Sequence, residues 1–223
     1  MARYALLLVV LLVAAGDWLA VARGRRDLEL VFKPATLVAL LVVAWLLTQG
    51  PHDARQARFF LPGLGFSLLG DILLMLRGKR FFLGGLVAFL LAHVCYVIGF
   101  NPTVPPWSSF VILIPVAAIA AFLFRALARG LRQRGEGGML APVAIYSAVL
   151  SGMLFSAWAT LFRRQWTGLR QGLAIAGASL FFLSDAMLAW DRFVESFPRA
   201  HLLVHVTYHL GQIALTASIA QVG

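Results

Sequence analysis

The chain has 223 residues, of which 61% are hydrophobic and only 13% are charged. A soluble domain has nearer to ~45–50% apolar and ~25% charged residues, so the composition excludes an ordinary soluble protein and predicts an integral membrane protein. The net charge of +10 does not indicate nucleic-acid binding. The basic residues lie in short gaps between apolar runs, as they do in multi-pass membrane proteins.

Eight windows are long and apolar enough to cross a bilayer, which takes ~20 residues of helix. We expect all of them to be α-helices, because open strands would leave backbone groups without hydrogen bonds in lipid. The first window is interpreted as a retained helix rather than a signal peptide, and Asp17 near its end as an ordinary interfacial charge. In chain order the windows are roughly 4–22, 32–49, 58–76, 81–100, 108–128, 139–161, 169–190 and 199–220.

The basic residues predict an orientation. The odd-numbered connections between these helices carry 13 of the 19 Arg and Lys residues. Because cytoplasmic loops are rich in Arg and Lys, we expect a multi-pass protein of the cell membrane with these connections in the cytoplasm and both termini outside. The whole chain, 1–223, is expected to form one all-α membrane domain, with the basic, glycine-rich segment 129–138 as a linker between its halves.

Two aspartates interrupt stretches that otherwise suit lipid: Asp71 in FSLLGDILLML and Asp185 in GASLFFLSDAMLAW. A carboxylate in the middle of a membrane helix costs ~2.5–3.5 kcal/mol on insertion scales, so such a residue indicates a functional site. Each aspartate is followed by a His-x-x-Tyr sequence, HVCY at 93–96 and HVTY at 205–208. We therefore predict that the two aspartates form one site.

The halves, about 1–128 and 139–223, look like a duplication. The aspartates are 114 residues apart, and Pro34 and Pro142 are 108 apart. Four spans in each half make the predicted repeat parallel, with a pseudo-twofold axis along the membrane normal. Both aspartates would then lie ~7–8 Å from the cytoplasmic end of their helices, in one pocket facing the inner leaflet. The alternative is chance similarity among apolar helices of narrow composition.

Other polar residues in the spans each have more than one interpretation. His93 and Tyr96 share one face of a helix and either bind substrate, orient an aspartate or are satisfied interior groups. Lys33, just inside the cytoplasmic interface, either binds a lipid phosphate as a point charge or extends its amine to the surface.

Three histidines, His201, His205 and His209, recur every four residues on one helix face. Such spacing can bind zinc, and with Asp71 it is similar to the His and Asp arrangement of alkaline-ceramidase-type zinc hydrolases. His201 lies near the interface, however, and no compact third-ligand motif accompanies the histidines. We therefore expect no metal and no cofactor, and keep a zinc-dependent lipid hydrolase as an alternative.

The segments LLGDILLM with LAHVCYVIGF, and LSDAMLAWDRF with TYHLGQ, resemble the YhhN/TMEM86 family, as does the Lys33-Pro34 pair. The resemblance covers nearly the whole chain. It implies an eight-span lysoplasmalogenase, which hydrolyses the vinyl ether bond of lysoplasmalogens to a fatty aldehyde and glycerophosphoethanolamine or glycerophosphocholine.

The resemblance also assigns residues. It implies that Asp71 and Asp185 are the catalytic pair and that His93 and Tyr96 match the AH-x-x-Y of the fourth helix. Tyr208 and Gln212 match the family's Y-x-x-x-Q. The residues that we expect to bind substrate or support the aspartates are Lys33, His93, Tyr96, His205, Tyr208 and Gln212. The histidines at 201, 205 and 209 depart from the family pattern.

Vinyl ether hydrolysis begins with proton transfer to the β carbon, which gives an oxocarbenium ion that water captures. It needs one protonated carboxyl, which burial favours, and one ionised carboxylate, as in glycosidases. We expect Asp185 to be the acid, with a lysophospholipid as substrate and membrane lipids as surroundings. The alternative from another class is a proton-coupled transporter or lipid-binding protein. Aspartates near one membrane face, rather than at the midplane, favour the enzyme.

Overall fold

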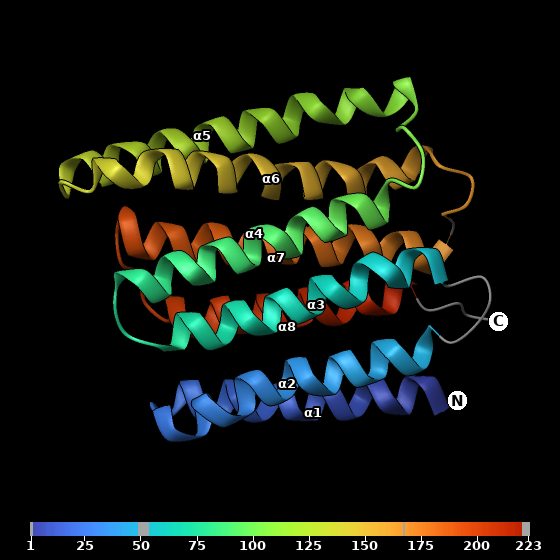
Figure 1. Ribbon diagram of the computed structural model, residues 1–223, viewed down its shortest axis with the longest axis horizontal. Coiled ribbons are helices and arrows are strands. Elements are labelled where there is room, and N and C mark those ends of the chain that lie inside the picture. The colour runs from blue at the N-terminus through green and yellow to red at the C-terminus, as the bar shows by residue number, and fades with distance from the viewer. Residues whose placement is uncertain (1, 49–53, 167, 220–223) are drawn as a thin grey trace.

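The structure, a computed structural model, describes residues 2–48, 54–166 and 168–219. These residues fold into eight long α-helices and three short 3-10 helices, arranged side by side along one axis (Figure 1). The elements are α1 (Ala2–Ala22), α2 (Arg26–Leu47), α3 (Ala54–Met75), α4 (Lys79–Phe100), η1 (Trp107–Ile112), α5 (Leu113–Gln133), η2 (Gly137–Met139), α6 (Leu140–Trp158), η3 (Ala159–Phe162), α7 (Gly168–Phe193) and α8 (Ala200–Ile219).

The predicted all-α membrane fold is confirmed. Within the described residues, seven segments are long and apolar enough to cross a membrane, and Leu6–Ala22 of α1 forms a shorter apolar helix. The prolines do not interrupt the helices: Pro34 lies inside α2 and Pro62 inside α3. Helix α3 is continuous despite its internal proline, so it is not one of the broken helices that transporters use.

The predicted linker at 129–138 is only partly a linker, because α5 continues through its first half to Gln133. Gly130, in this last part of α5, has a packing role. A Cβ atom at that position would lie 1.9 Å from the carbonyl oxygen of Phe193, so the absence of a side chain lets the end of α5 dock directly on the end of α7. The turn itself is confined to the residues around Gly135, which has a φ of 71°.

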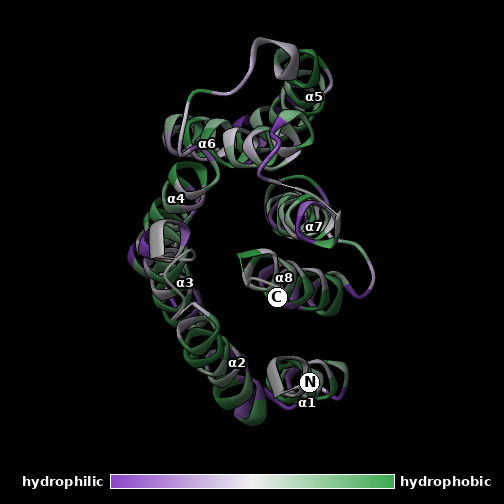
Figure 2. Ribbon diagram, turned by 90° about the vertical axis from the view of Figure 1, so that its right-hand side faces the viewer, coloured by the Kyte–Doolittle hydropathy of each residue, from purple (hydrophilic) through white to green (hydrophobic). Residues whose placement is uncertain are grey.

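Helix α8 lies at the centre of the bundle. Viewed along the helices, α2, α3, α4 and α6 form a curved row around α7 and α8, with α1 at one end and α5 outermost at the other (Figure 2). In α8, 61% of the membrane span is buried, against 17% in the span that contains α5. The burial of α8 explains why so many polar residues of the chain can meet on it.

Two glycines allow α7 and α8 to pack at very short distance. A Cβ atom on Gly177 would lie 2.7 Å from the backbone nitrogen of Leu215, and one on Gly211 would lie 2.9 Å from that of Phe181. Small residues at helix interfaces are how membrane helices approach closely, since lipid supplies no hydrophobic drive between them. The α7–α8 pair is thereby held in one register.

A buried arginine joins the two halves at the end where α4 terminates. Arg163, only 4% exposed, donates hydrogen bonds to the side chains of Thr103 and Asn101 at 2.9 Å each and to the carbonyl of Thr103 at 2.8 Å. Asn101 in turn donates to Ser156 at 2.7 Å. Arg163 is thus a structural residue. This role explains why a basic residue lies in the connection between α6 and α7, on the side where the positive-inside pattern predicts few basic residues.

The predicted repeat stays a prediction. Helix pairs α2–α3 and α6–α7 both pack together, as do α3–α4 and α7–α8. The first helices of the two halves differ, however, because α1 packs against α8 whereas α5 packs against α7.

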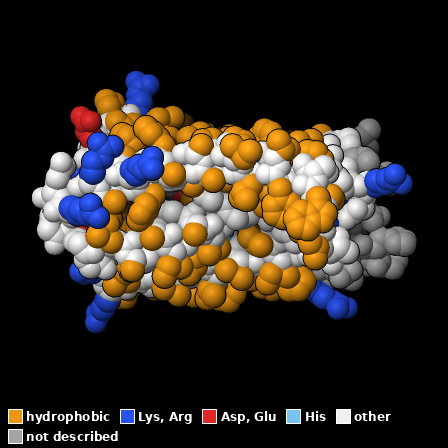
Figure 3. Space-filling model, turned by 90° about the horizontal axis from the view of Figure 1, so that it is seen from above, with side chains coloured by type: hydrophobic (Ala, Val, Ile, Leu, Met, Phe, Trp, Pro, Cys, Tyr) orange, Lys and Arg blue, Asp and Glu red, His pale blue; other side chains and the backbone are white. Residues whose placement is uncertain are grey.

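The surface has the division expected of a membrane protein. One face shows a broad band of hydrophobic side chains, with Lys and Arg gathered at the two ends and more of them at one end (Figure 3). That end carries the connections α1–α2, α3–α4, α5–α6 and α7–α8 (Figure 1). A band of this kind is what a bilayer would cover.

The α7–α8 contact yields a stability prediction. Gly177→Ala should lower the thermal unfolding midpoint in detergent, because backbone atoms would have to move; overpacking of this kind costs about 1–3 kcal/mol. Gly172→Ala is the matched control in the same helix, where a Cβ atom meets nothing within 4 Å. It should be neutral or gain up to about 1 kcal/mol from helix propensity. Equal midpoints for the two variants would contradict the packing argument.

Candidate active site

Asp71 on α3 lies in a buried ion pair. Its side chain is 1% exposed, and its Oδ1 lies 3.2 Å from the Nζ of Lys33 on α2. The hydroxyl of Tyr208, on α8, donates a hydrogen bond to Oδ2 at 2.8 Å. The Lys33 amine also lies 5.7 Å from the centre of the Tyr208 ring. Three helices therefore meet at one carboxylate, and its charge is balanced by a cation.

Asp185 on α7 has different partners. The hydroxyl of Tyr146, on α6, donates a hydrogen bond to its Oδ2. The Nε2 of His93, on α4, lies 3.6 Å from the same oxygen, slightly beyond hydrogen-bond distance. No lysine or arginine among the described residues forms an ion pair with Asp185.

Tyr146 was not among the residues singled out from the sequence. One signal could have found it: it follows Pro142 by four residues, and Pro142 is the counterpart of Pro34 in the predicted repeat. The second helix of each half thus supplies a partner to the aspartate of the third helix, Lys33 in one half and Tyr146 in the other.

Aromatic rings connect the two aspartate clusters. The buried ring of Phe181 lies 4.7 Å from the His93 ring and 5.3 Å from the Tyr208 ring, centre to centre. Next to it, Tyr96 donates a hydrogen bond to Oε1 of Gln212 at 2.8 Å. Each His-x-x-Tyr sequence therefore reaches across to the other half of the chain. His93 approaches Asp185, and Tyr208 contacts Asp71.

His205 lies apart from both aspartates of the predicted pair. Its Nδ1 is 2.7 Å from Oδ2 of Asp17 on α1, and His209 Nδ1 is 3.7 Å from the same oxygen. Trp18 donates to His209 at 3.2 Å. The expectation that Asp17 is an ordinary interfacial charge was wrong, because its side chain is fully buried. The packing of α1 against α8, which the sequence did not indicate, causes this.

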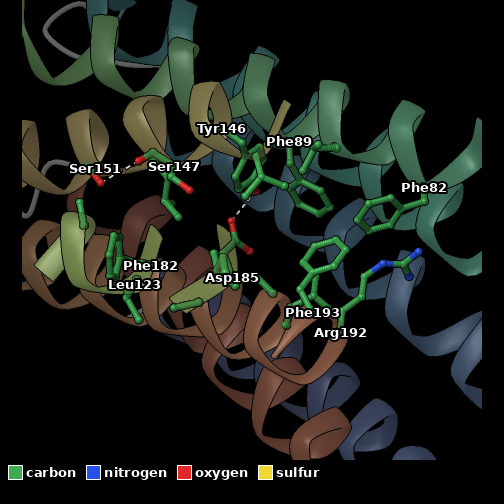
Figure 4. A pocket seen from close by; sticks show the side chains of 18 of the residues that line it. Phe82, Phe89, Leu123, Tyr146, Ser147, Ser151, Phe182, Asp185, Arg192 and Phe193 are labelled. Carbon is green, nitrogen blue, oxygen red and sulfur yellow. Dashed lines mark hydrogen bonds between the residues drawn. The ribbon is translucent and has the colours of Figure 1, made fainter. Parts of the chain in front are cut away.

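An apolar pocket reaches Asp185. It lies among α3, α4, α5, α6 and α7, and its wall is aromatic and aliphatic apart from a few polar groups. In Figure 4, Asp185 and Tyr146 face it near the middle, Ser147 and Ser151 lie toward one end, and Arg192 lies toward the other. The guanidinium carbon of Arg192 lies 3.7 Å from the centre of the Phe82 ring. The pocket therefore combines a surface for an aliphatic chain with one carboxyl group.

A second pocket, of about 180 Å³, lies between α2, α3, α7 and α8 and is lined by Arg26, Glu29, Lys33 and His201 among others. Leu74 and Leu188 line both pockets. Each leucine follows its aspartate by three residues. A polar and an apolar pocket are therefore neighbours, with the two leucines between them.

Fold and site together define a class: a multi-pass helical membrane protein with two buried aspartates, one of which lines an apolar pocket. The match of a family model narrows this class. Residues 28–219 match the model of the YhhN family, and the chain belongs to that family. No solved structure matches it.

Curated relatives carry the name lysoplasmalogenase. Human lysoplasmalogenase TMEM86B is 36% identical over 155 residues, which cover 68% of this chain and 59% of that protein. The mouse TMEM86B protein is 32% identical over 84% of this chain and 74% of its own length. The lysoplasmalogenase of Mycobacterium tuberculosis is 27% identical over 87% of this chain and 71% of its own. The matched region thus spans less than two thirds of the human relative.

The buried ion pair gives the next prediction. Lys33→Met would leave Asp71 without a cation, and breaking a buried pair on one side costs about 3–5 kcal/mol. The thermal midpoint should fall strongly. The double variant Lys33→Met/Asp71→Asn should recover most of the loss, because no uncompensated charge remains. If the double variant were as unstable as the single one, the loss of stability would not come from the uncompensated charge of Asp71.

Proposed function

We propose that the protein hydrolyses the vinyl ether bond of lysoplasmalogens, releasing a fatty aldehyde and a glycerophospho-alcohol. One observation carries the proposal: a carboxyl group, Asp185, faces an apolar pocket, while a second, Asp71, is held next to a lysine beside a polar pocket. The names of the curated relatives support the same reaction.

Asp185 is the general acid in this proposal. Its neighbours Tyr146 and His93 can hold the carboxyl by neutral contacts, and the apolar wall favours the uncharged form. Asp185 gives its proton to the β carbon of the vinyl ether, and the double-bond electrons form the new C–H bond. The α carbon and the ether oxygen then share the positive charge of an oxocarbenium ion.

Water completes the reaction. It attacks the α carbon, and the Asp185 carboxylate, now ionised, takes the proton that the water loses. The product is a hemiacetal. Its collapse breaks the bond between the α carbon and the ether oxygen, while the hydroxyl proton is lost and the leaving oxygen gains one, which gives the aldehyde and the alcohol. In this proposal His93, whose Nε2 is 3.6 Å from Asp185, orients the water.

Asp71 has a different role in the proposal. Lys33 favours its ionised form by charge pairing, and in this proposal the negative charge helps to stabilise the oxocarbenium ion. It also positions the Lys33 amine at the polar pocket, while Tyr208 and the Tyr96–Gln212 pair fix the surrounding helices.

The two neighbouring pockets suit the two parts of the substrate. The alkenyl chain lies in the apolar pocket, and the phosphate lies at Lys33 and Arg26 in the polar one. The bond to be cleaved then passes near Leu74 and Leu188. The basic end of the bundle faces the cytoplasm in this proposal, so the head group enters from the inner leaflet.

Purified protein tests the reaction. It should release fatty aldehyde from a lysoplasmalogen but not from the matched ester or saturated ether lysophospholipid. Asp185→Asn and Asp71→Asn should each reduce turnover by at least 100-fold, since removing acid–base participation costs roughly 10²–10⁴. Asp27→Asn, on an exposed carboxylate paired with Arg25, is the control and should keep wild-type turnover.

Three outcomes would contradict the proposal. Cleavage of the ester alone would replace the reaction, and full activity in both site variants would remove the aspartates from it. Tight binding of the lipid without cleavage would instead favour the transporter or lipid-binding alternative.

The apolar pocket should set chain length. Ala120 lines the pocket from α5, so Ala120→Phe should fill part of it and shift the preference, measured as kcat/KM, toward shorter alkenyl chains. One extra or missing methylene in a hydrophobic pocket changes selectivity by about 1–3 kcal/mol. Ala118→Phe, on the exposed face of the same helix, should leave the preference unchanged. The same shift in both variants would mean that the chain binds elsewhere.

A further inference from the structure

A cluster of metal-ligating side chains lies in the polar pocket that Lys33 also lines. Glu29 on α2 and His201 and His205 on α8 each offer one ligand atom, and these three atoms lie within 4.8 Å of one another. The Nε2 of His201 is 3.3 Å from Oε1 of Glu29, and the Nε2 of His205 is 4.0 Å from it. All three residues line the polar pocket.

The second ring nitrogen of His205 is held by a carboxylate. Its Nδ1 lies 2.7 Å from Oδ2 of the buried Asp17, and an ionised carboxylate only accepts hydrogen bonds. The proton is then on Nδ1, and Nε2 keeps its lone pair. Histidines that bind metals usually donate their other ring N–H to a carboxylate in this way.

The lone pair of His205 faces a carboxylate oxygen rather than a donor. A nitrogen lone pair and a carboxylate oxygen repel each other unless a cation lies between them. At present Arg26 is the cation that contacts Oε1 of Glu29. The Arg26 side chain is 50% exposed, so it can release Glu29 when another cation takes its place.

We propose that Glu29, His201 and His205 bind one divalent transition-metal ion, with zinc the best match to two imidazoles and a carboxylate. His209 is not a ligand, since it contacts Asp17 and Trp18. The site thus differs from the three-histidine face considered from the sequence. Its open coordination position faces the polar pocket, one helical turn from Lys33, where it accepts water or an anionic oxygen.

Zinc titration of the untagged full chain in detergent tests the site without measuring activity. One Zn²⁺ per chain should bind, and Mg²⁺ should not compete. Glu29→Gln and His201→Gln should weaken zinc affinity at least 10-fold, and Asp17→Asn should weaken it roughly 10–100-fold by loosening His205. Arg26→Gln should tighten binding, because it removes the competing cation. Because His201 is 58% exposed, its variant should fold even if the Asp17 variant does not.

The control is His209→Gln, on the same helix, which should keep wild-type zinc affinity. Each variant is first shown to elute like the wild type in size-exclusion chromatography. Absence of zinc binding by the wild type would overturn the site. If the Glu29→Gln variant and the His201→Gln variant each bound zinc with wild-type affinity, the ligand assignment would be overturned. The aldehyde-release assay is separate, so failure of one proposal leaves the other testable.

Discussion

The contact of Asp71 with Lys33 and Tyr208 is the interaction on which the rest of the core depends. An unpaired carboxylate at this depth would be expensive, so α2, α3 and α8 must bring their partners to within hydrogen-bond distance. Once these three helices are fixed, α8 is central and α7 follows it through the glycine contact. Asp185 is then carried to the wall of the apolar pocket.

The same requirement explains the polar groups that have no place in the proposed chemistry. Asp17 is paired with histidines of α8, and Arg163 is bonded to the α4–η1 connection. A bundle in lipid has no water to satisfy such groups. Polar residues therefore act as specific ties between helices that apolar packing alone would leave free to slide.

The sequence was sufficient for the helices, because length and hydropathy alone define a span. Asp71 and Asp185 could be found as well, since a charge in an apolar helix stands out. The partners of Tyr146 and Asp17 could not be assigned, because they depend on which helices are neighbours. Hydropathy does not encode that α1 packs on α8 or that the first His-x-x-Tyr reaches the second aspartate. Gly130 shows the same limit, since its close approach to Phe193 became visible only in three dimensions.

Leu74 and Leu188, which stand between the two pockets, have a consequence for what happens after bond cleavage. Under the proposed function, an intact lysoplasmalogen would lie across them, whereas each fragment would belong on one side only. The aldehyde is most soluble in the acyl region of the bilayer, and the glycerophospho-alcohol in water. In the proposed reaction, the two fragments would diffuse away in opposite directions once the bond breaks. Recombination would thereby be discouraged, and release of one product would not wait for the other.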